Sequence, residues 1–204
     1  MAKRPDPTAR IVDSTLKLAA DHRWRDISLE DIAAKAKIPM AGLYDHFRCK
    51  QAILSAFNTQ IDRQMLTDDE GQSTDETVRD RLFEVLMRRF DAMQPHREAI
   101  GSILRDTVIV DPIASLIGLA DLKRSMAWAL EAAGVSSAGP VGHLRAKVLG
   151  AIYLSVVRAW LVDDSDDLSK TMAALDRGLQ RAEQLNGLCR LRRPRAERAA
   201  AQES

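Results

Sequence analysis

Residues 28–50 read SLEDIAAKAKIPMAGLYDHFRCK, and their pattern is the most informative part of the sequence about the fold. Ser28 stands three residues before Asp31, a spacing typical of a capped helix start. The hydroxyl accepts an orphan backbone N–H, and the carboxylate faces the positive end of the helix. A break follows from Lys37 to Pro39, and a short polar segment then runs to Phe47. The pattern predicts two short helices joined by a tight turn.

The two short helices carry small and apolar residues on the faces that would meet. Two helices that cross at a steep angle need small residues at the crossing and a compact apolar set beneath it. The spacing therefore predicts a helix-turn-helix, although apolar spacing of this kind also occurs in plain three-helix packing units. The predicted buried residues are Ile32, Ala33, Ala36, Ile38, Leu43 and Phe47, and the predicted outward residues are Met40, Ala41, Gly42, Asp45 and His46.

The rest of the chain is predicted to be helical as well, so the fold class is all-α. Apolar residues recur at three- and four-residue spacing, and alternating strand patterns are absent. Outside the opening stretch, helices are predicted at 7–22, 50–66, 75–93, 95–107, 112–120, 121–133, 141–162 and 166–187.

Charge and pattern together divide the chain into three parts. The net charge of +1 is unevenly spread: residues 1–50 carry +3, residues 51–186 carry −5, and residues 187–204 carry +3. We expect a helix-turn-helix domain at 1–50, linked by helix 50–66 to a helical ligand-binding and dimerisation domain at 67–189. A flexible basic tail is expected at 190–204, because this segment is rich in charged residues but has no apolar residues at helical spacing.

Several classes of function are not supported by the sequence. The N-terminus lacks the apolar segment of a secretion signal, and no stretch approaches eighteen consecutive apolar residues, so we expect a cytoplasmic protein without membrane insertion. Catalytic and phosphate-binding motifs are absent, so no enzymatic activity or cofactor is predicted. Cys49 and Cys189 fit no metal-ligand spacing, and the DDSDD run at 163–167 is interpreted as a helix cap rather than a metal site.

The longer stretch RIVDSTLKLAADHRWRDISLEDIAAKAKIPMAGLYDHFRCKQAIL, residues 10–54, resembles the DNA-binding region of TetR-family transcriptional repressors. The resemblance implies that the third helix enters the major groove of double-stranded DNA. It also implies that Tyr44 and Lys50 contact phosphates while Phe47 packs in the core. Base contacts would be made by Met40, Ala41 and Gly42, which lack bidentate donors and suit apolar contact with bases or close approach of the backbone. The predicted DNA-binding residues are Ser28, Lys37, Met40, Ala41, Gly42, Tyr44, His46 and Lys50.

The chain departs from the family pattern at two positions of the turn. Family members usually have glycine where Lys37 stands and serine or threonine where Pro39 stands. The turn thus loses the residue best suited to positive φ, and the third helix loses a capping hydroxyl. We expect Lys37 to adopt the turn at some strain and to offer a further phosphate contact, and Pro39 to fit a helix start.

The same resemblance implies a homodimer that binds an inverted-repeat operator and a small hydrophobic effector. Two long helices, 141–162 and 166–187, have apolar seams suited to pairing with a second copy, although such seams also close the core of a single chain. The predicted dimer residues are Leu144, Val148, Ile152, Val156, Leu168, Met172, Leu175 and Leu179. The predicted ligand residues are His96, Arg97, Arg105, Trp128 and Tyr153, with core packing, solvation or pairing with acids as their alternative roles.

A second, weaker resemblance favours a different function. DRLFEVLMRRFDAMQPHREAI at 80–100 and AWLVDDSDDLSKTMAALDRGLQRAE at 159–183 are similar to segments of a lipid-binding accessory family of ubiquinone biosynthesis. That resemblance implies a TetR-like fold with an apolar cavity for an isoprenoid or fatty acyl chain and no DNA binding. Those relatives lack a well-formed G-L-Y-x-H-F element, which this chain has at residues 42–47. The leading prediction is therefore a ligand-released repressor, with the lipid-binding protein as the alternative.

Overall fold

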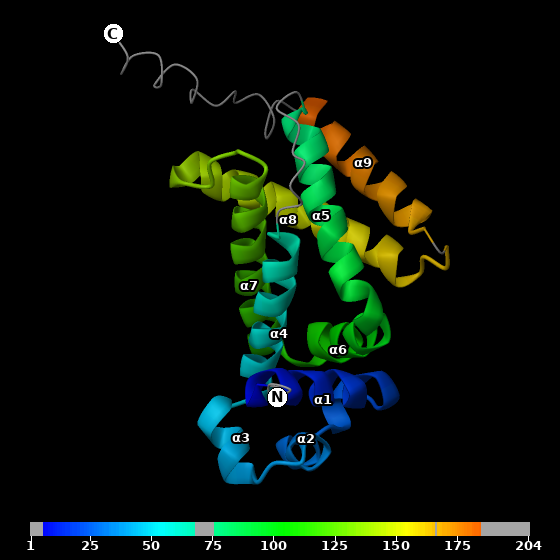
Figure 1. Cartoon of the computed structure of the whole chain (residues 1–204). Helices are drawn as coiled ribbons and strands as arrows, with labels where there is room; N and C mark the ends of the chain where they lie inside the picture. Colours follow the sequence, from blue (N-terminus) through cyan, green and yellow to red (C-terminus); the bar gives the residue numbers. More distant parts are fainter. Residues whose placement is uncertain (1–5, 68–75, 166, 185–204) are drawn as a thin grey trace, which may run out of the picture. The chain divides into compact units, whose positions relative to one another are not determined.

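A computed structural model describes residues 6–67, 76–165 and 167–184, and side chains within these ranges except at 108–110. All regular elements in these ranges are helical, which confirms the all-α fold class (Figure 1). None of the described helices is long and apolar enough to cross a membrane. The elements are α1 (Pro7–Asp21), η1 (Trp24–Asp26), α2 (Leu29–Ala36), α3 (Met40–His46), α4 (Lys50–Met65), α5 (Val78–Met93), η2 (Gln94–His96), α6 (Arg97–Val110), α7 (Pro112–Ala132), α8 (Gly139–Leu161) and α9 (Ser169–Gln184).

One predicted break is absent from the structure. The segments 112–120 and 121–133 were expected as two helices, but α7 runs without interruption from Pro112 to Ala132. The helix begins where the sequence predicts, since Asp111 accepts a hydrogen bond from the Ala114 N–H at 2.9 Å. No residue within α7 has a positive φ that would end it. The predicted tail at 190–204 lies outside the described residues.

The chain forms two compact units. The first contains the described residues up to Arg63 together with Asp91–Asp121, and the second contains the described residues of Gln64–Phe90 and those from Leu122 onward. This division cuts the chain differently from the boundaries predicted from sequence, because α6 groups with the N-terminal helices. The predicted ligand-binding and dimerisation domain therefore stays a prediction.

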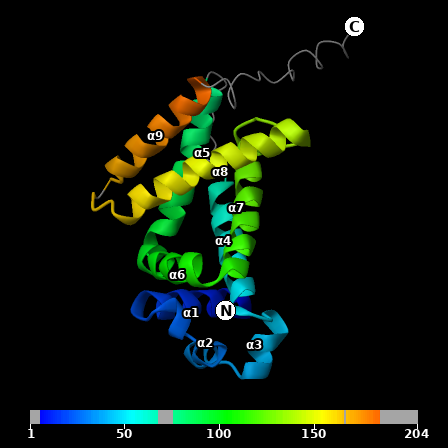
Figure 2. The same ribbon diagram turned by 180° about the vertical axis from the view of Figure 1, so that it is seen from behind.

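The first unit is organised around α1. Figures 1 and 2 show α6 along one side of α1, with α2 and α3 on the other side. Asp6 caps α1 by accepting a hydrogen bond from the Thr8 N–H at 3.1 Å, and Pro7 occupies the first helical position. The buried face of α1 consists of Ile11, Val12, Ser14, Thr15, Leu16 and Ala19.

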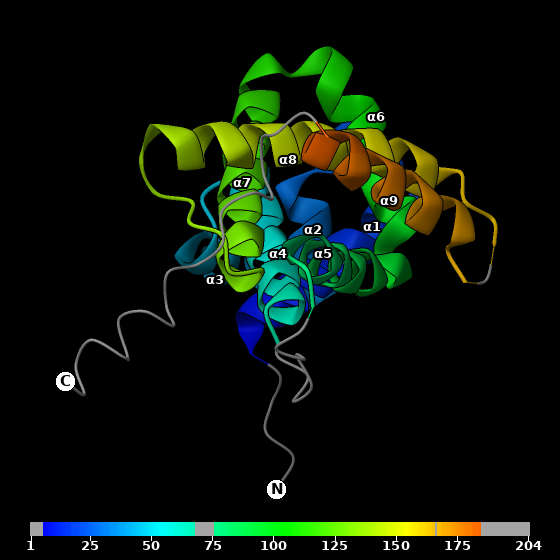
Figure 3. The same cartoon turned by 90° about the horizontal axis from the view of Figure 1, so that it is seen from above.

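The second unit is organised around α8 and α9, which lie side by side (Figure 3). Gly178 on α9 allows this close approach, because a Cβ there would lie 2.6 Å from Ile152 Cγ2. Trp160 from α8 and Leu175 from α9 are fully buried between these helices and their neighbours. The seams predicted from sequence thus pack largely within one chain.

The turn between α8 and α9 is held by a buried carboxylate. Asp163 accepts hydrogen bonds from the Thr171 N–H at 2.8 Å and the Thr171 hydroxyl at 2.7 Å, and also from the Ser165 hydroxyl. Burial would raise the pKa of Asp163, but hydrogen bonds from Ser165 and Thr171 outweigh it and hold that pKa well below the usual range. Asp167 accepts from the Ser169 N–H at 3.1 Å. This part of the DDSDD run therefore caps α9, and no cluster of His, Cys, Asp or Glu among the described residues is arranged to hold a metal ion.

Replacing Asp163 with asparagine should destabilise the protein. The charge-assisted bonds to Thr171 weaken, so we expect the free energy of unfolding at neutral pH to fall by about 1–3 kcal/mol. Because the folded-state pKa is depressed, the stabilising contribution is complete above the unfolded pKa, near 4, and is lost as pH falls below it. Urea denaturation from neutral to acidic pH measures both effects. Equal stability of the two proteins at neutral pH would contradict this role.

Candidate nucleic-acid interface

The start of α2 is fixed by a reciprocal capping box. The Ser28 N–H donates to Asp31 Oδ2 at 2.8 Å, and the Asp31 N–H donates to Ser28 Oγ at 3.1 Å. Hydrogen bonds from the side chain and the backbone of Ser28 lower the pKa of Asp31. Both groups are exposed, but their polar atoms satisfy each other. Ser28 is therefore tied to the helix start, as the sequence predicts.

The turn after α2 runs through a left-handed lysine. Lys37 has φ 53° and ψ 49°, the conformation for which glycine is the usual residue. Its N–H donates to the Ala34 carbonyl at 3.1 Å, and the Ile38 N–H donates to the Ala33 carbonyl at 3.0 Å, which ends α2 cleanly. The side chain of Lys37 is exposed. The expectation that lysine adopts this turn is confirmed.

Helix α3 presents one buried side and one exposed side. Leu43 is 1% exposed and Phe47, which follows the helix, is 7% exposed, whereas Met40 is 48% exposed and Tyr44 is 56% exposed. Ala41 and His46 are also exposed. Pro39 stands at the N-cap without a side-chain hydrogen bond, as expected from its lack of a hydroxyl. Asp45 is exposed as well, so the residues predicted to face outward do so except Gly42, which is half-buried.

Gly42 lies on α3 without a structural need for glycine. A Cβ built there would meet only Pro39 side-chain atoms, at 3.5 and 3.6 Å, which is ordinary van der Waals contact. Gly42 also lacks a positive φ. Glycine costs about 1 kcal/mol relative to alanine inside a helix. The fold therefore accepts a side chain at this position.

Tyr44 and Arg48 form an exposed pair at the end of α3. The Arg48 guanidinium donates to Tyr44 Oη at 2.6 Å and lies 4.2 Å from the centroid of the tyrosine ring. Arg48 thereby holds Tyr44 in place while its other donors stay available. A hydroxyl and a guanidinium side by side form a surface suited to phosphate oxygens.

Lys50 makes contacts within the chain that the sequence did not predict, and the phosphate contact implied by the family resemblance stays a prediction. Its ammonium donates to the carbonyls of Trp24 and Ile27, each at 2.7 Å, and is half-buried. Burial lowers the pKa of Lys50, while carboxylates nearby act in the opposite direction. Sequence reasoning missed this contact, because the carbonyls lie 26 and 23 residues earlier in the chain.

The five predicted ligand residues are not gathered in one cavity. His96 and Arg97 border a hollow of about 420 Å³ between α1 and the start of α6, where the His96 ring meets Phe57 edge-on at 5.3 Å. Arg105 and Trp128 are exposed, and Trp128 is 54% exposed. Tyr153 is buried beneath Arg89, whose Nε donates to its hydroxyl at 3.1 Å. The packing role that the sequence left open fits Tyr153.

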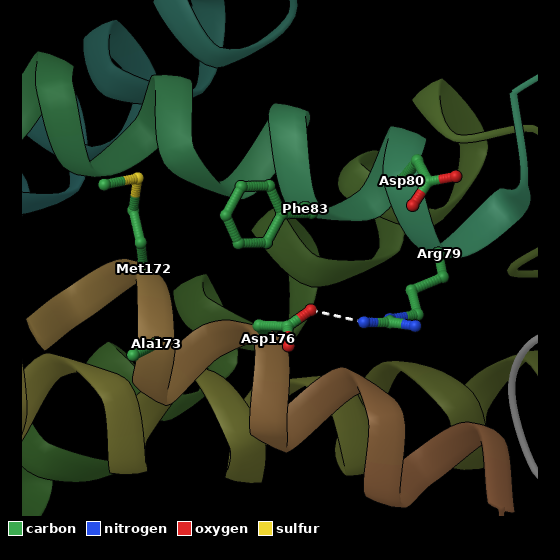
Figure 4. Close-up of a pocket in the computed structure, with 6 residues that line it drawn as sticks. All are labelled: Arg79, Asp80, Phe83, Met172, Ala173 and Asp176. Carbon is green, nitrogen blue, oxygen red and sulfur yellow. Dashed lines mark hydrogen bonds and ion pairs between the residues drawn. The ribbon is translucent and has the colours of Figure 1, made fainter. Parts of the chain in front are cut away.

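A second hollow, of about 400 Å³, lies between α5 and α9 in the second unit (Figure 4). Its apolar lining consists of Phe83 from α5 and of Met172 and Ala173 from α9. An ion pair between Arg79 and Asp176 lies at one end. None of the five predicted ligand residues lines this hollow. No sequence pattern predicts this hollow, because its walls come from α5 and α9, which are far apart along the chain.

The predicted dimer residues fall into two groups. Leu144 is 61% exposed and Val148 is 38% exposed, so both are available to a partner. Ile152 and Met172 are half-buried. The remaining four, Val156, Leu168, Leu175 and Leu179, are buried within the chain itself. For those four, burial fits the intramolecular alternative, because α8 and α9 pack on each other.

Comparisons with known proteins agree with this geometry. Residues 11–57 match the family described as bacterial regulatory proteins, tetR family. No protein with a curated description matches the sequence. The matched segment contains α2, α3 and the start of α4, so the predicted resemblance of this region is confirmed.

Solved structures extend the likeness over most of the chain. A TetR transcriptional regulator from Nitrosomonas europaea ATCC 19718 is 25% identical with a TM-score of 0.72, over 88% of this chain and 99% of that one. A TetR transcriptional regulator from Rhodococcus sp. RHA1 is 17% identical with a TM-score of 0.62, over 85% and 93%. SmeT, in a complex with triclosan, is 22% identical with a TM-score of 0.56, over 86% and 90%. The fold is that of TetR-type regulators, whereas the resemblance to the ubiquinone accessory family stays a prediction.

Replacing Lys37 with glycine should stabilise the protein. A non-glycine residue in the left-handed region destabilises the folded state by about 1–2 kcal/mol. Glycine removes this strain, but it loses more conformational entropy on folding, which offsets part of the gain. We therefore expect the free energy of unfolding to rise by about 0.5–1 kcal/mol in urea denaturation. Lys35→Gly, at an exposed site inside α2, is the matched control and should lower it by about 1 kcal/mol. A loss of stability in Lys37→Gly would contradict strain at this turn.

Proposed function

We propose that this chain, whose fold and N-terminal region are those of TetR-type transcriptional regulators, is a homodimeric repressor. It binds an inverted-repeat operator and leaves it when a small hydrophobic molecule binds. The observation that carries the proposal is the exposed side of α3, where Met40, Ala41 and Tyr44 face outward while Leu43 and Phe47 secure the helix from beneath. A helix supported in this way can enter the major groove.

The proposed DNA contacts divide by chemistry. Met40, Ala41 and Gly42 carry no donor that could read guanine or adenine bidentately, so they suit thymine methyl groups and close backbone approach. Tyr44, Arg48 and Lys37 are exposed around α3 and suit phosphate oxygens. His46 is exposed at the end of the helix. Sequence preference would therefore come from shape and apolar contact more than from hydrogen bonds to bases.

The proposed dimer uses the exposed side of α8. Val141, Leu144 and Val148 follow each other at three- and four-residue spacing and are 58%, 61% and 38% exposed. Ala151 and Ser155 continue the stripe at the same spacing and are exposed too. Large apolar residues in such a row favour pairing with another helix. A two-fold pair would set the recognition helices about 34 Å apart, one turn of DNA.

Support for a small effector comes from the SmeT structure, which contains triclosan and shares the fold. The lipid-binding alternative requires a large apolar cavity, and the two hollows described above are both bordered by charged side chains. The well-formed α3 element also favours the DNA-binding function. Release requires that the effector bind the free form more tightly than the DNA-bound form.

Gly42→Ala should separate DNA binding from folding. Because the fold accepts a Cβ there, we expect the variant to be as stable as the wild type or more so, by up to about 1 kcal/mol. If DNA approaches the backbone at this point, affinity for an inverted-repeat fragment should fall at least roughly tenfold, or about 1.4 kcal/mol. Mobility shift with fragments of the genomic neighbourhood and thermal denaturation give the two readouts.

Gly118→Ala is the matched control for this experiment. Gly118 lies in α7, and apart from its chain neighbours and the adjacent turns of helix backbone, no heavy atom lies within 4 Å of the position that a Cβ would take. We expect the same gain in helix stability there with no change in affinity. Unchanged affinity in Gly42→Ala would refute close approach at α3, and the absence of any retained fragment would refute the DNA-binding proposal.

Leu144→Glu should disrupt the proposed dimer. A carboxylate in the α8 stripe would have to be buried opposite the partner, so we expect a monomer in sedimentation equilibrium and weaker operator binding. Leu154→Glu is the matched control, because Leu154 is 44% exposed on α8 but lies outside the stripe. A Leu144 variant that stays dimeric would show that the stripe is not the interface.

A further inference from the structure

The connector between α1 and α2 is held by the side chain that opens α4. Lys50 Nζ donates to the Trp24 carbonyl and to the Ile27 carbonyl, both at 2.7 Å, and lies 4.1 Å from the centroid of the Trp24 ring. An ammonium has three donors, and two of them are used by these carbonyls. The aromatic face adds a cation–π contact on the same group. All these partners belong to the first compact unit.

We propose that Lys50 is a positioning residue for DNA recognition, which clasps the two ends of the helix-turn-helix together. Ile27 directly precedes Ser28, the N-cap of α2, and Lys50 is the first residue of α4, three positions after Phe47 at the end of α3. Helices α2 and α3 therefore lie between the two clasped residues. Holding Ile27 against Lys50 restricts how far the pair can tilt away from α1 and α4.

The clasp holds a connector that is itself fixed from a second direction. The Trp24 N–H donates to Ser102 Oγ at 3.3 Å, and the Arg25 N–H donates to Asp106 Oδ2 at 3.0 Å. The Ser102 hydroxyl donates in turn to the His22 carbonyl at 3.1 Å. The Trp24 and Ile27 carbonyls are thus bound by α4, whereas α6 binds two N–H groups of the connector and the His22 carbonyl. Lys50 therefore binds a connector that is also held by hydrogen bonds to α6.

The charges around Lys50 suit an ammonium held in the protein. Asp26 on η1, Asp31 on α2 and Asp106 on α6 each favour its charged form, against the desolvation that lowers its pKa. These acidic side chains would repel a DNA phosphate brought to the same place. Arg48, two residues earlier, is exposed and bonded to Tyr44, with donors left for phosphate. The geometry thus gives the phosphate role to Arg48 and the positioning role to Lys50.

Lys50→Met tests the proposal, because it keeps the length of the side chain and removes its donors. Two partly buried carbonyls lose their partner, so we expect the thermal midpoint to fall by at least roughly 3 °C. DNA affinity should fall by the same factor at about 50 and 200 mM salt, so that the slope of log K against log salt is unchanged. The functional half of this test rests on the proposed DNA binding, whereas the midpoint does not.

Arg48→Met is the matched control, since it removes a charge from the same short segment. It should leave the midpoint within about 1 °C, as surface changes usually do, and should reduce the salt slope by about 0.9 for one lost phosphate contact. The opposite pattern, in which Lys50→Met keeps the wild-type midpoint or loses about 0.9 of the slope, overturns the proposal. If wild-type protein binds no DNA, the repressor function fails and the midpoint still decides the role of Lys50.

A measurement on the wild type covers the case in which Lys50→Met does not fold. In nitrogen-15 NMR of the DNA-free protein, we expect one lysine ammonium signal whose protons exchange with water more slowly than those of the other lysines. Loss of that signal in Lys50→Arg assigns it to Lys50. Hydrogen-bonded ammonium protons exchange slowly because they must first break free. A Lys50 signal that exchanges as fast as the rest overturns the clasp.

Discussion

The structure around the candidate interface depends on the burial of Leu43 and Phe47, because the helix that carries Leu43 and ends at Phe47 is too short to be stable alone. Helix α3 runs only from Met40 to His46, and isolated helices need roughly 12–15 residues to be even marginally stable in water. Its stability must therefore come from packing on α2. The packing of α3 on α2, with Leu43 and Phe47 buried, determines that α3 forms and which of its sides remains exposed.

Other features of the first unit keep that short helix in register. The capping box at Ser28 fixes where α2 begins, and the left-handed turn at Lys37 fixes where it ends. Lys50 ties the start of α4 to the connector ahead of α2. Each feature restrains a different end of the two helices, so little freedom is left for α3. An outward face that is exposed yet rigidly supported is what recognition of a regular duplex requires.

The sequence was sufficient to predict the features that depend on local chemistry. The capped start at Ser28, the strained turn at Lys37 and the inward Leu43 and Phe47 all follow from short-range patterns, and the structure confirms them. It was not sufficient where distant segments meet. The sequence predicts that Lys50 contacts phosphate, but it does not show that folding brings the carbonyls of Trp24 and Ile27 to its ammonium. The sequence likewise predicts Leu175 as an interface residue, but it does not show that this side chain is buried where α9 packs on α8. The break predicted inside 112–133 was wrong because no residue there ends a helix.

The proposed function requires that the outward side of α3 contact duplex DNA, and NMR mapping of the binding site in solution measures this contact. Duplexes bound by the protein would first be selected from a random-sequence pool, and the best inverted repeat then titrated into isotope-labelled protein. We expect the largest backbone NMR shifts at Met40, Ala41, Gly42 and Tyr44, with the signals of the buried Leu43 side chain unchanged. Tight binding that leaves the amides of α3 unshifted, with the changes elsewhere in the chain, would contradict it.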